Sequence, residues 1–195
     1  MCDTETKTLI YLHGFLSSPQ SVKAQQTKEF WQKQYPDIQF FCEQLPYHPE
    51  PTKEMLHELM HQHEGEHIGF IGSSLGGFLA SYLVEHFGGK AVLINPAVTP
   101  YRVLAEYLGE HVHPYTQESF ELSEQHMQYL KTMDTPKLQQ PENYWVLLQT
   151  GDETLDYKEA EQKYRDSKLT IEQGGDHAFQ GYERFLPDIF AFLFR

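Results

Sequence analysis

Short apolar runs alternate with longer amphipathic stretches along most of the chain. The runs are rich in Val, Ile, Leu and aromatic residues and predict buried strands, whereas apolar positions three and four apart predict helices. The predicted strands are 7–12, 38–42, 68–71, 90–94, 143–149 and 168–172. The predicted helices are 21–35, 52–63, 75–87, 156–165 and 182–194.

This alternation also predicts the fold class. Continuous apolar strands joined by helices are typical of a parallel sheet that is covered by helices on both faces. We therefore expect an α/β protein with three layers and a mostly parallel sheet of about six strands. Residues 1–195 are enough for one domain with a substantial core, and ligands of such sheets bind beyond the carboxyl ends of the strands.

The helix expected at 52–63 follows a loop, because residues 44–51 contain three prolines. Thr52 is the candidate N-cap of that helix, since a threonine hydroxyl can accept a hydrogen bond from a free backbone N–H in the first turn. The apolar positions of the helix form one stripe and should face the core; they are Met55, Leu56, Leu59 and Met60.

Residues 97–141 interrupt the alternation. They are polar, aromatic and helix-leaning, and residues 96–136 contain four prolines. A long excursion between two strands is often a lid or cap over a site, so we expect a helical cap insertion here. Its larger side chains could line a pocket or simply pack the cap, and packing is the simpler expectation; they are Tyr101, Leu104, Tyr107, Leu108 and Tyr115.

The most informative motif is Gly72-Ser73-Ser74-Leu75-Gly76, which matches G-x-S-x-G. It lies between a predicted strand and a predicted helix, and in that context the motif is a sharp turn that exposes a nucleophilic serine. The backbone of such a turn is crowded, so the small residues Gly72 and Gly76 fit on either side of it. We therefore predict that Ser74 is a nucleophile, placed at a helix N-terminus that favours negative charge.

A serine hydroxyl needs a base to take its proton and an acid to orient that base. The candidate base is His177, which follows Gly174-Gly175-Asp176 in the loop after the last predicted strand. The candidate acid is Asp152, immediately after strand 143–149. The resulting order of serine, acid and histidine is the one that this architecture uses.

Two other carboxylates compete with Asp152 for the role of the acid. Asp156 lies three positions before Glu159 and resembles a capping box, so it is more simply read as a helix N-cap. Asp176 is a weaker candidate, because a side chain adjacent to His177 in sequence rarely reaches round to orient the imidazole ring.

Acyl transfer also needs backbone N–H groups that stabilise an oxyanion. One should come from Leu75, the residue after the nucleophile, and the other from the loop after the first strand, where Phe15 is the candidate. We interpret His13 as a residue that braces this loop and not as a second base.

Residues 57–61 match the zinc protease motif H-E-x-x-H, and residues 63–67 match it again. No third ligand is evident at a matching position, and Gly65 should end the helix within the second copy. The first copy places its Glu and His residues on the solvated side of its helix. We therefore expect no native metal and no cofactor.

Composition limits the partners. The formal net charge of −13 argues against a nucleic acid or an anionic membrane as the main partner. Cys2 and Cys42 do not suggest a disulfide framework, residues 1–5 do not resemble the start of a signal peptide, and no apolar stretch approaches a membrane span. We expect a cytoplasmic protein that acts on a small molecule as a monomer or weak homodimer.

Several motifs taken together resemble the YqiA-type bacterial esterases, which are small α/β-hydrolases. The resemblance runs nearly end to end, in register and in order; it is carried by Leu9-Ile10-Tyr11-Leu12-His13-Gly14-Phe15 with Ser17-Ser18-Pro19, by Gly72-Ser73-Ser74-Leu75-Gly76-Gly77, by Asn95-Pro96-Ala97-Val98, by Thr150-Gly151-Asp152-Glu153 with Leu155-Asp156-Tyr157, and by Gly174-Gly175-Asp176-His177-Ala178-Phe179. It implies Ser74 as nucleophile, Asp152 as acid and His177 as base. It also implies activity on short acyl esters and on acyl-CoA thioesters.

The sequence therefore predicts a serine hydrolase. Two alternatives from other classes remain: a non-catalytic ligand-binding protein on a hydrolase fold, and a zinc hydrolase that uses residues 57–61. Covalent labelling of Ser74 separates the first from the enzyme, and sensitivity to a chelator identifies the second.

Overall fold

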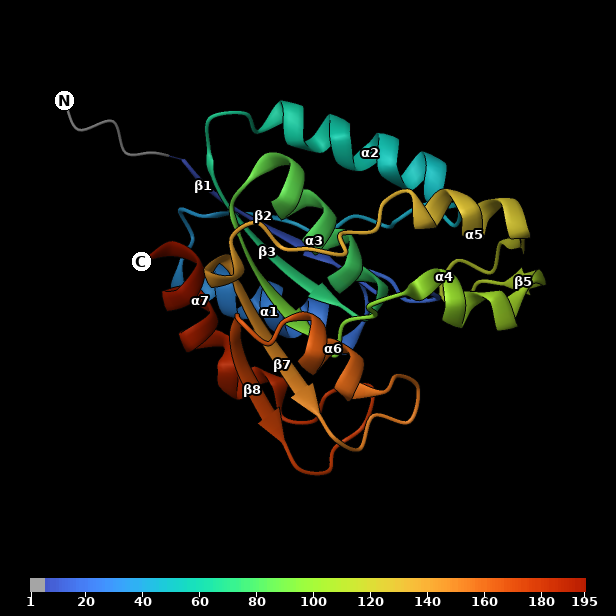
Figure 1. The fold of residues 1–195 in the computed structure, drawn as a ribbon. Coiled ribbons are helices and arrows are strands. Elements are labelled where there is room, and N and C mark those ends of the chain that lie inside the picture. The colour runs from blue at the N-terminus through green and yellow to red at the C-terminus, as the bar shows by residue number, and fades with distance from the viewer. Residues whose placement is uncertain (1–5) are drawn as a thin grey trace.

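The computed structural model describes residues 6–195. The expectations that Cys2 belongs to no disulfide framework and that residues 1–5 do not start a signal peptide lie outside the described residues. Six strands form one sheet in the order β2-β1-β3-β4-β7-β8, and every neighbouring pair is parallel (Figure 1). The strands are β1 Lys7–Leu12, β2 Gln39–Phe41, β3 His67–Ser73, β4 Lys90–Ile94, β7 Tyr144–Gln149 and β8 Lys168–Glu172. The prediction of a six-stranded parallel sheet is confirmed.

Helices cover both faces of this sheet (Figure 1). One face packs against α1 Val22–Gln34, the 3₁₀ turn η3 Tyr182–Phe185 and α7 Leu186–Phe194. The other face packs against α2 Pro49–Gln62, α3 Leu75–Phe87 and α6 Tyr157–Lys163. The strands contribute side chains to the hydrophobic core on each face of the sheet. Leu9 and Ile10, for example, are buried on opposite faces of β1. Burial on both faces explains why the central strands are apolar at nearly every position.

The register of the sheet brings several strand ends to the same edge. Leu12 of β1 pairs with Gly72 of β3, and Ser73 of β3 pairs with Ile94 of β4. Farther along the sheet, β7 and β8 stay paired up to their last residues, Gln149 and Glu172. Loops that follow these strands must therefore meet beyond one edge, where parallel sheets bind ligands.

The start of α2 differs from the prediction. The helix begins at Pro49, with His48 as its N-cap, so Thr52 is not the cap. Proline fits the first turn, since the N–H groups there have no helical partner. The hydroxyl of Thr52 instead donates to the carbonyls of His48 at 2.8 Å and Pro46 at 3.1 Å.

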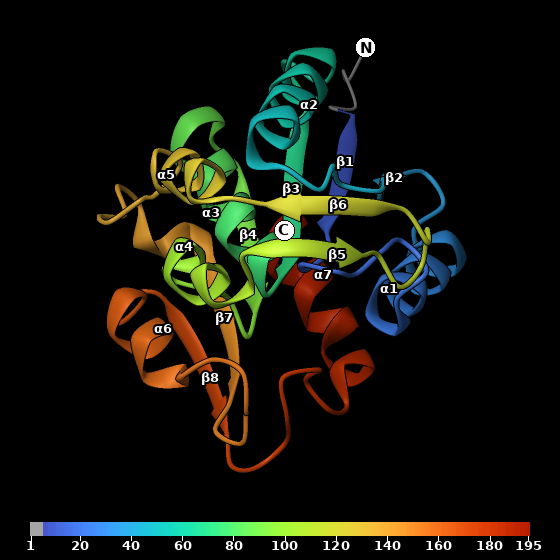
Figure 2. The same cartoon turned by 90° about the vertical axis from the view of Figure 1, so that its right-hand side faces the viewer.

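The cap segment, residues 97–141, extends beyond the carboxyl ends of the strands (Figures 1 and 2). It contains α4 Pro100–Val103, the 3₁₀ turn η1 Leu104–Tyr107, β5 Gly109–Val112, β6 Ser119–Leu122 and α5 Glu124–Lys131, and the short turn η2 Pro141–Asn143 leads into β7. Strands β5 and β6 form an antiparallel hairpin, which the sequence pattern did not predict. Figure 2 shows this hairpin in front of the central sheet.

The helices of residues 6–195 are too short or too polar to cross a membrane.

Candidate active site

Ser74 occupies a strained turn between β3 and α3. Its backbone has φ 55° and ψ −119°, a conformation that residues other than glycine rarely adopt. A Cβ at Gly72 would collide with the backbone of Gly76, and a Cβ at Gly76 would collide with the carbonyl of Leu12. The two glycines are therefore required by close backbone approach, and they hold the serine where its side chain projects from the end of the sheet.

His177 and Asp152 reach Ser74 from two other strand ends. His177 Nε2 lies 3.1 Å from Ser74 Oγ, and His177 Nδ1 lies 2.8 Å from Asp152 Oδ2 and 3.0 Å from Asp152 Oδ1. A carboxylate can only accept, so the Nδ1 atom carries the proton and Nε2 is free to accept from the serine. The three residues thus form a continuous chain from hydroxyl to imidazole to carboxylate.

Asp152 is fixed by its own loop. The side chain is 2% exposed, and its Oδ1 atom accepts hydrogen bonds from the backbone N–H groups of Thr154 at 2.9 Å and Leu155 at 2.8 Å. These bonds hold the carboxylate in place without using the oxygen nearest the imidazole. Asp156 instead caps α6, accepting from the N–H of Lys158 at 3.0 Å.

The loop after β1 packs directly against the serine. A Cβ added to Gly14 would lie 3.2 Å from Ser74 Cβ and 3.7 Å from Ser74 Oγ. Within residues 6–195, the backbone N–H groups of Phe15 and Leu75 donate to no protein acceptor, and both residues line the pocket that contains Ser74. Backbone N–H groups that are left without a protein acceptor can serve as donors to an oxyanion.

His13 connects this loop to the segment before α2. Its Nε2 accepts from the N–H of Leu45 at 3.0 Å, and its Nδ1 lies 2.9 Å from the carbonyl of Gly14. Burial lowers the pKa of His13 from its usual value, which keeps the ring neutral so that Nε2 can accept. These contacts match the bracing role expected from the sequence.

Asn95, which immediately follows β4, is a positioning residue that the sequence reasoning did not identify. It is 2% exposed, and its Nδ2 donates to the carbonyls of Asp176 at 3.0 Å and His177 at 3.2 Å. Its Oδ1 accepts from the N–H of Gln149 at 3.0 Å. One buried amide therefore links the end of β7 to the loop that holds His177.

Three further side chains hold the same loop. Gln149 accepts from the N–H of Gln180 at 2.8 Å through Oε1. Glu153 accepts from the N–H of His177 at 3.0 Å, and Lys23 of α1 donates to the carbonyl of Ala178 at 2.6 Å. The imidazole is thus positioned from several directions, as a general base must be.

We expect Asn95→Asp to lower kcat for ester hydrolysis by about 10- to 100-fold with little change in KM. Aspartate retains the size and the acceptor for Gln149, but its carboxylate oxygen would face two carbonyls and displace the His177 loop. Steady-state kinetics on p-nitrophenyl acetate measures the effect. Asn143→Asp is the matched control, because the side chain of Asn143 donates to the side chain of Gln140 and not to the His177 loop. Equal kcat in Asn95→Asp and wild type would contradict this role.

A pocket of about 220 Å³ opens at Ser74 and His177. We call it the catalytic pocket; the cap side chains among its lining residues are Ala97, Pro100, Val103, Leu104 and Tyr107. Of the other cap side chains considered above, Tyr101 donates to Asp134 Oδ2 at 2.9 Å, while Leu108 and Tyr115 are 40% and 50% exposed. Leu104 packs in the core, as expected, and Leu104 and Tyr107 also line this pocket.

The H-E-x-x-H motifs lie away from this site. In residues 57–61, His57 Nε2 lies 2.7 Å from the hydroxyl of Tyr82, and the ring of His61 packs against Phe87. Among residues 6–195 no group of three or more His, Cys, Asp or Glu side chains has a geometry that could hold a metal ion. The two histidines of residues 57–61 thus contact α3. In the second motif, His63 Nδ1 lies 3.0 Å from Glu66, and His67 Nε2 lies 3.1 Å from the carbonyl of Leu193 in α7.

Comparisons with known proteins place this geometry in context. A model of the Uncharacterised protein family (UPF0227) matches residues 8–194. Similar solved structures include a protein from Agrobacterium vitis S4 that has been assigned as a hydrolase, with 18% identity, coverage of 96% of this chain and 88% of that one, and a TM-score of 0.74. Est1E from Butyrivibrio proteoclasticus has 12% identity, coverage of 96% and 87%, and a TM-score of 0.67.

The Pyrococcus furiosus esterase Pf2001 is also similar, with 14% identity, coverage of 96% of this chain and 83% of that one, and a TM-score of 0.65. At these identities the likeness shows the fold, which is that of the α/β-hydrolases.

Proposed function

The chain belongs to the UPF0227 family, the YqiA-type family that its motifs resemble, and from this premise we propose that it is a serine hydrolase that cleaves carboxylic esters. The observation that carries the proposal is the row of hydrogen-bond contacts from Ser74 through His177 to Asp152. His177 Nε2 lies 3.1 Å from Ser74 Oγ, and His177 Nδ1 lies 2.8 Å from Asp152 Oδ2. Such a row of contacts activates a hydroxyl that is otherwise a weak nucleophile. The neighbouring N–H groups of Phe15 and Leu75 support the same reaction.

In the first step, Ser74 Oγ bonds to the ester carbonyl carbon and its proton passes to His177 Nε2. The carbonyl oxygen becomes an oxyanion that accepts from the N–H groups of Phe15 and Leu75. The bond to the leaving alcohol then breaks, and the imidazolium of His177 gives its proton to the departing oxygen. The product is an acyl-enzyme on Ser74 and a free alcohol, or a free thiol where the substrate is a thioester.

In the second step, water attacks the acyl carbon while His177 takes one of its protons. The bond between the acyl group and Ser74 Oγ breaks, and the proton returns from His177 to the serine oxygen. The carboxylic acid leaves, and the enzyme is restored. Asp152 stabilises the imidazolium that forms transiently in each step.

We expect a fluorophosphonate to label the protein covalently at Ser74, because only an activated serine displaces fluoride from phosphorus at a useful rate. Peptide mass spectrometry locates the adduct. Prior incubation with a carboxylic ester should slow the labelling, since substrate and probe compete for one hydroxyl. A protein that merely binds ligands on this fold would remain unlabelled, and that result would overturn the proposal.

A further inference from the structure

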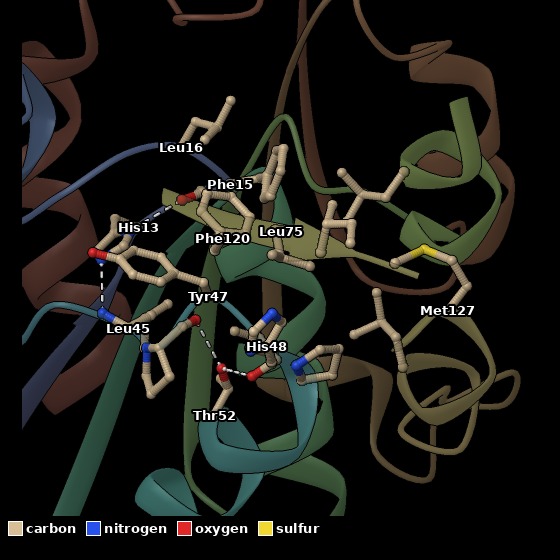
Figure 3. A pocket seen from close by; sticks show the side chains of 17 residues that line it. His13, Phe15, Leu16, Leu45, Tyr47, His48, Thr52, Leu75, Phe120 and Met127 are labelled. Atoms are coloured by element: carbon tan, nitrogen blue, oxygen red, sulfur yellow. Dashed lines mark hydrogen bonds between the residues drawn. The ribbon is translucent and has the colours of Figure 1, made fainter. Parts of the chain in front are cut away.

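A second cavity lies behind the catalytic pocket. It is lined by the loop after β1, by residues 45–52 at the start of α2, by α3, by Leu104, by β6 of the hairpin and by α5, and we call it the inner cavity (Figure 3). Its volume of about 50 Å³ exceeds the roughly 10–15 Å³ that one water molecule requires. Close-packed cores contain few voids of this size, so one that adjoins an active site calls for a functional explanation.

The inner cavity presents an apolar interior. Phe120 reaches it from β6 and Met127 from α5 (Figure 3), and Leu79 and Leu130 complete its inner wall. Four polar side chains also line it, and each has a hydrogen-bond partner. The Tyr47 hydroxyl bonds to Thr116 and Glu118, and His48 Nε2 lies 2.9 Å from the carbonyl of Glu121. Leu45 N–H donates to His13, and Thr52 donates to backbone carbonyls. Since these polar atoms have partners, the cavity suits a hydrocarbon chain better than water.

One layer of side chains separates the two cavities. Phe15, Leu16, Leu75 and Leu104 line both of them, whereas Ser74 and His177 line only the catalytic pocket. The inner cavity therefore adjoins the catalytic pocket across this layer, on the side away from Ser74 and His177. Leu104 is 7% exposed and is the one member of the layer that comes from the cap segment.

The chemistry of acylation assigns the direction of each part of the ester. The leaving oxygen must lie near His177 Nε2, because that atom gives it a proton. The oxyanion must face the N–H groups of Phe15 and Leu75. The remaining substituent of the carbonyl carbon is the acyl chain, which is left to point away from His177 and toward the inner cavity.

We propose that the acyl chain of the substrate enters the inner cavity past Leu104 and that this leucine, together with Met127, sets the acyl length that the enzyme prefers. The inference rests on the proposed function, since it assigns the acyl side of that same site. The substrates are then esters of unbranched apolar acids. Their alcohol or thiol part lies on the open side of the catalytic pocket.

The test is a series of p-nitrophenyl esters from acetate to dodecanoate, assayed with wild type, Leu104→Ala, Met127→Phe and the double variant. Each methylene that becomes buried should raise kcat/KM about fourfold. Leu104→Ala joins the two cavities and should move the preferred acyl length up by about two carbons or more. Met127→Phe fills the inner cavity and should lower kcat/KM for octanoate relative to acetate about tenfold.

The double variant should return toward the wild-type preference, because the phenylalanine fills the space that the alanine opens. Leu108→Ala is the matched control: Leu108 belongs to the cap, is 40% exposed and lines neither the catalytic pocket nor the inner cavity, so this variant should not move the preferred length. Acetate, which is too short to reach the inner cavity, reports in every variant whether the catalytic machinery is intact.

The outcomes separate this inference from the proposed function. If acetate hydrolysis depends on Ser74 but neither Leu104→Ala nor Met127→Phe moves the preferred acyl length, the inner cavity is not the acyl site and the serine hydrolase stands. If one variant fails to hydrolyse acetate, the other still decides, because one substitution opens the cavity and the other fills it. Absence of Ser74-dependent hydrolysis of every ester overturns both.

Discussion

Replacement of Ser74 by alanine is expected to lower kcat for ester hydrolysis by about 10⁶-fold, to the level that binding and the oxyanion N–H groups sustain alone. The reason is that Ser74 Oγ is the atom that bonds to the substrate, and no other hydroxyl has been found within reach of His177 Nε2 among residues 6–195. Steady-state kinetics on p-nitrophenyl acetate, with thermal unfolding measured in parallel, is sufficient to detect the effect.

Folding should survive this change. Alanine has the same Cβ as serine, so the cost of the φ of 55° is similar in both proteins. Ser73→Ala is the matched control, since Ser73 is the buried last residue of β3 and adjacent to the nucleophile. It should retain activity within a few-fold of wild type. Comparable activity in Ser74→Ala and Ser73→Ala would refute a serine mechanism.

The central sheet and the candidate catalytic residues could be predicted because their signals are local. The strands around Ser74, Asp152 and His177 are continuous apolar runs, and a parallel sheet places their carboxyl ends at one edge. Each residue lies at the end of such a run in the chain. The structure brings the three side chains together as the sequence order indicated.

The hairpin β5–β6 could not be predicted, because its local signal is weak. Its strands Gly109–Val112 and Ser119–Leu122 are short and mostly polar. Contacts with distant residues stabilise it: the ring of Phe120 stacks on Tyr47, with centroids 4.7 Å apart, and lies edge-to-face with Phe15 at 6.2 Å. Tertiary packing of this kind overrides the weak propensity of the segment.

The role of Asn95 could not be predicted for a related reason. An asparagine after a strand is an ordinary turn residue, and the sequence motif gave it no partner. Its function arises because β4 pairs with β7, which places Asn95 between the end of β7 and the loop after β8. That information is present only once the strand order is known.

Asp152→Asn is expected to lower kcat about 10⁴-fold while leaving the fold intact. The Asp152 carboxylate accepts from Nδ1 of His177 and so leaves Nε2 free to take the proton of Ser74. An asparagine amide can donate toward Nδ1, which favours the tautomer with the proton on Nε2. That tautomer cannot accept from the serine, so the base is lost although every residue stays in place.

The matched control for Asp152→Asn is Asp156→Asn, which makes the same chemical change four residues away. Asp156 is the N-cap of α6, and asparagine caps a helix about as well as aspartate does, so we expect kcat within about twofold of wild type. A large loss in Asp156→Asn with little loss in Asp152→Asn would reassign the acid. Fluorophosphonate labelling sharpens the test, because the slower labelling expected only in Asp152→Asn would show that the carboxylate acts through the imidazole on Ser74.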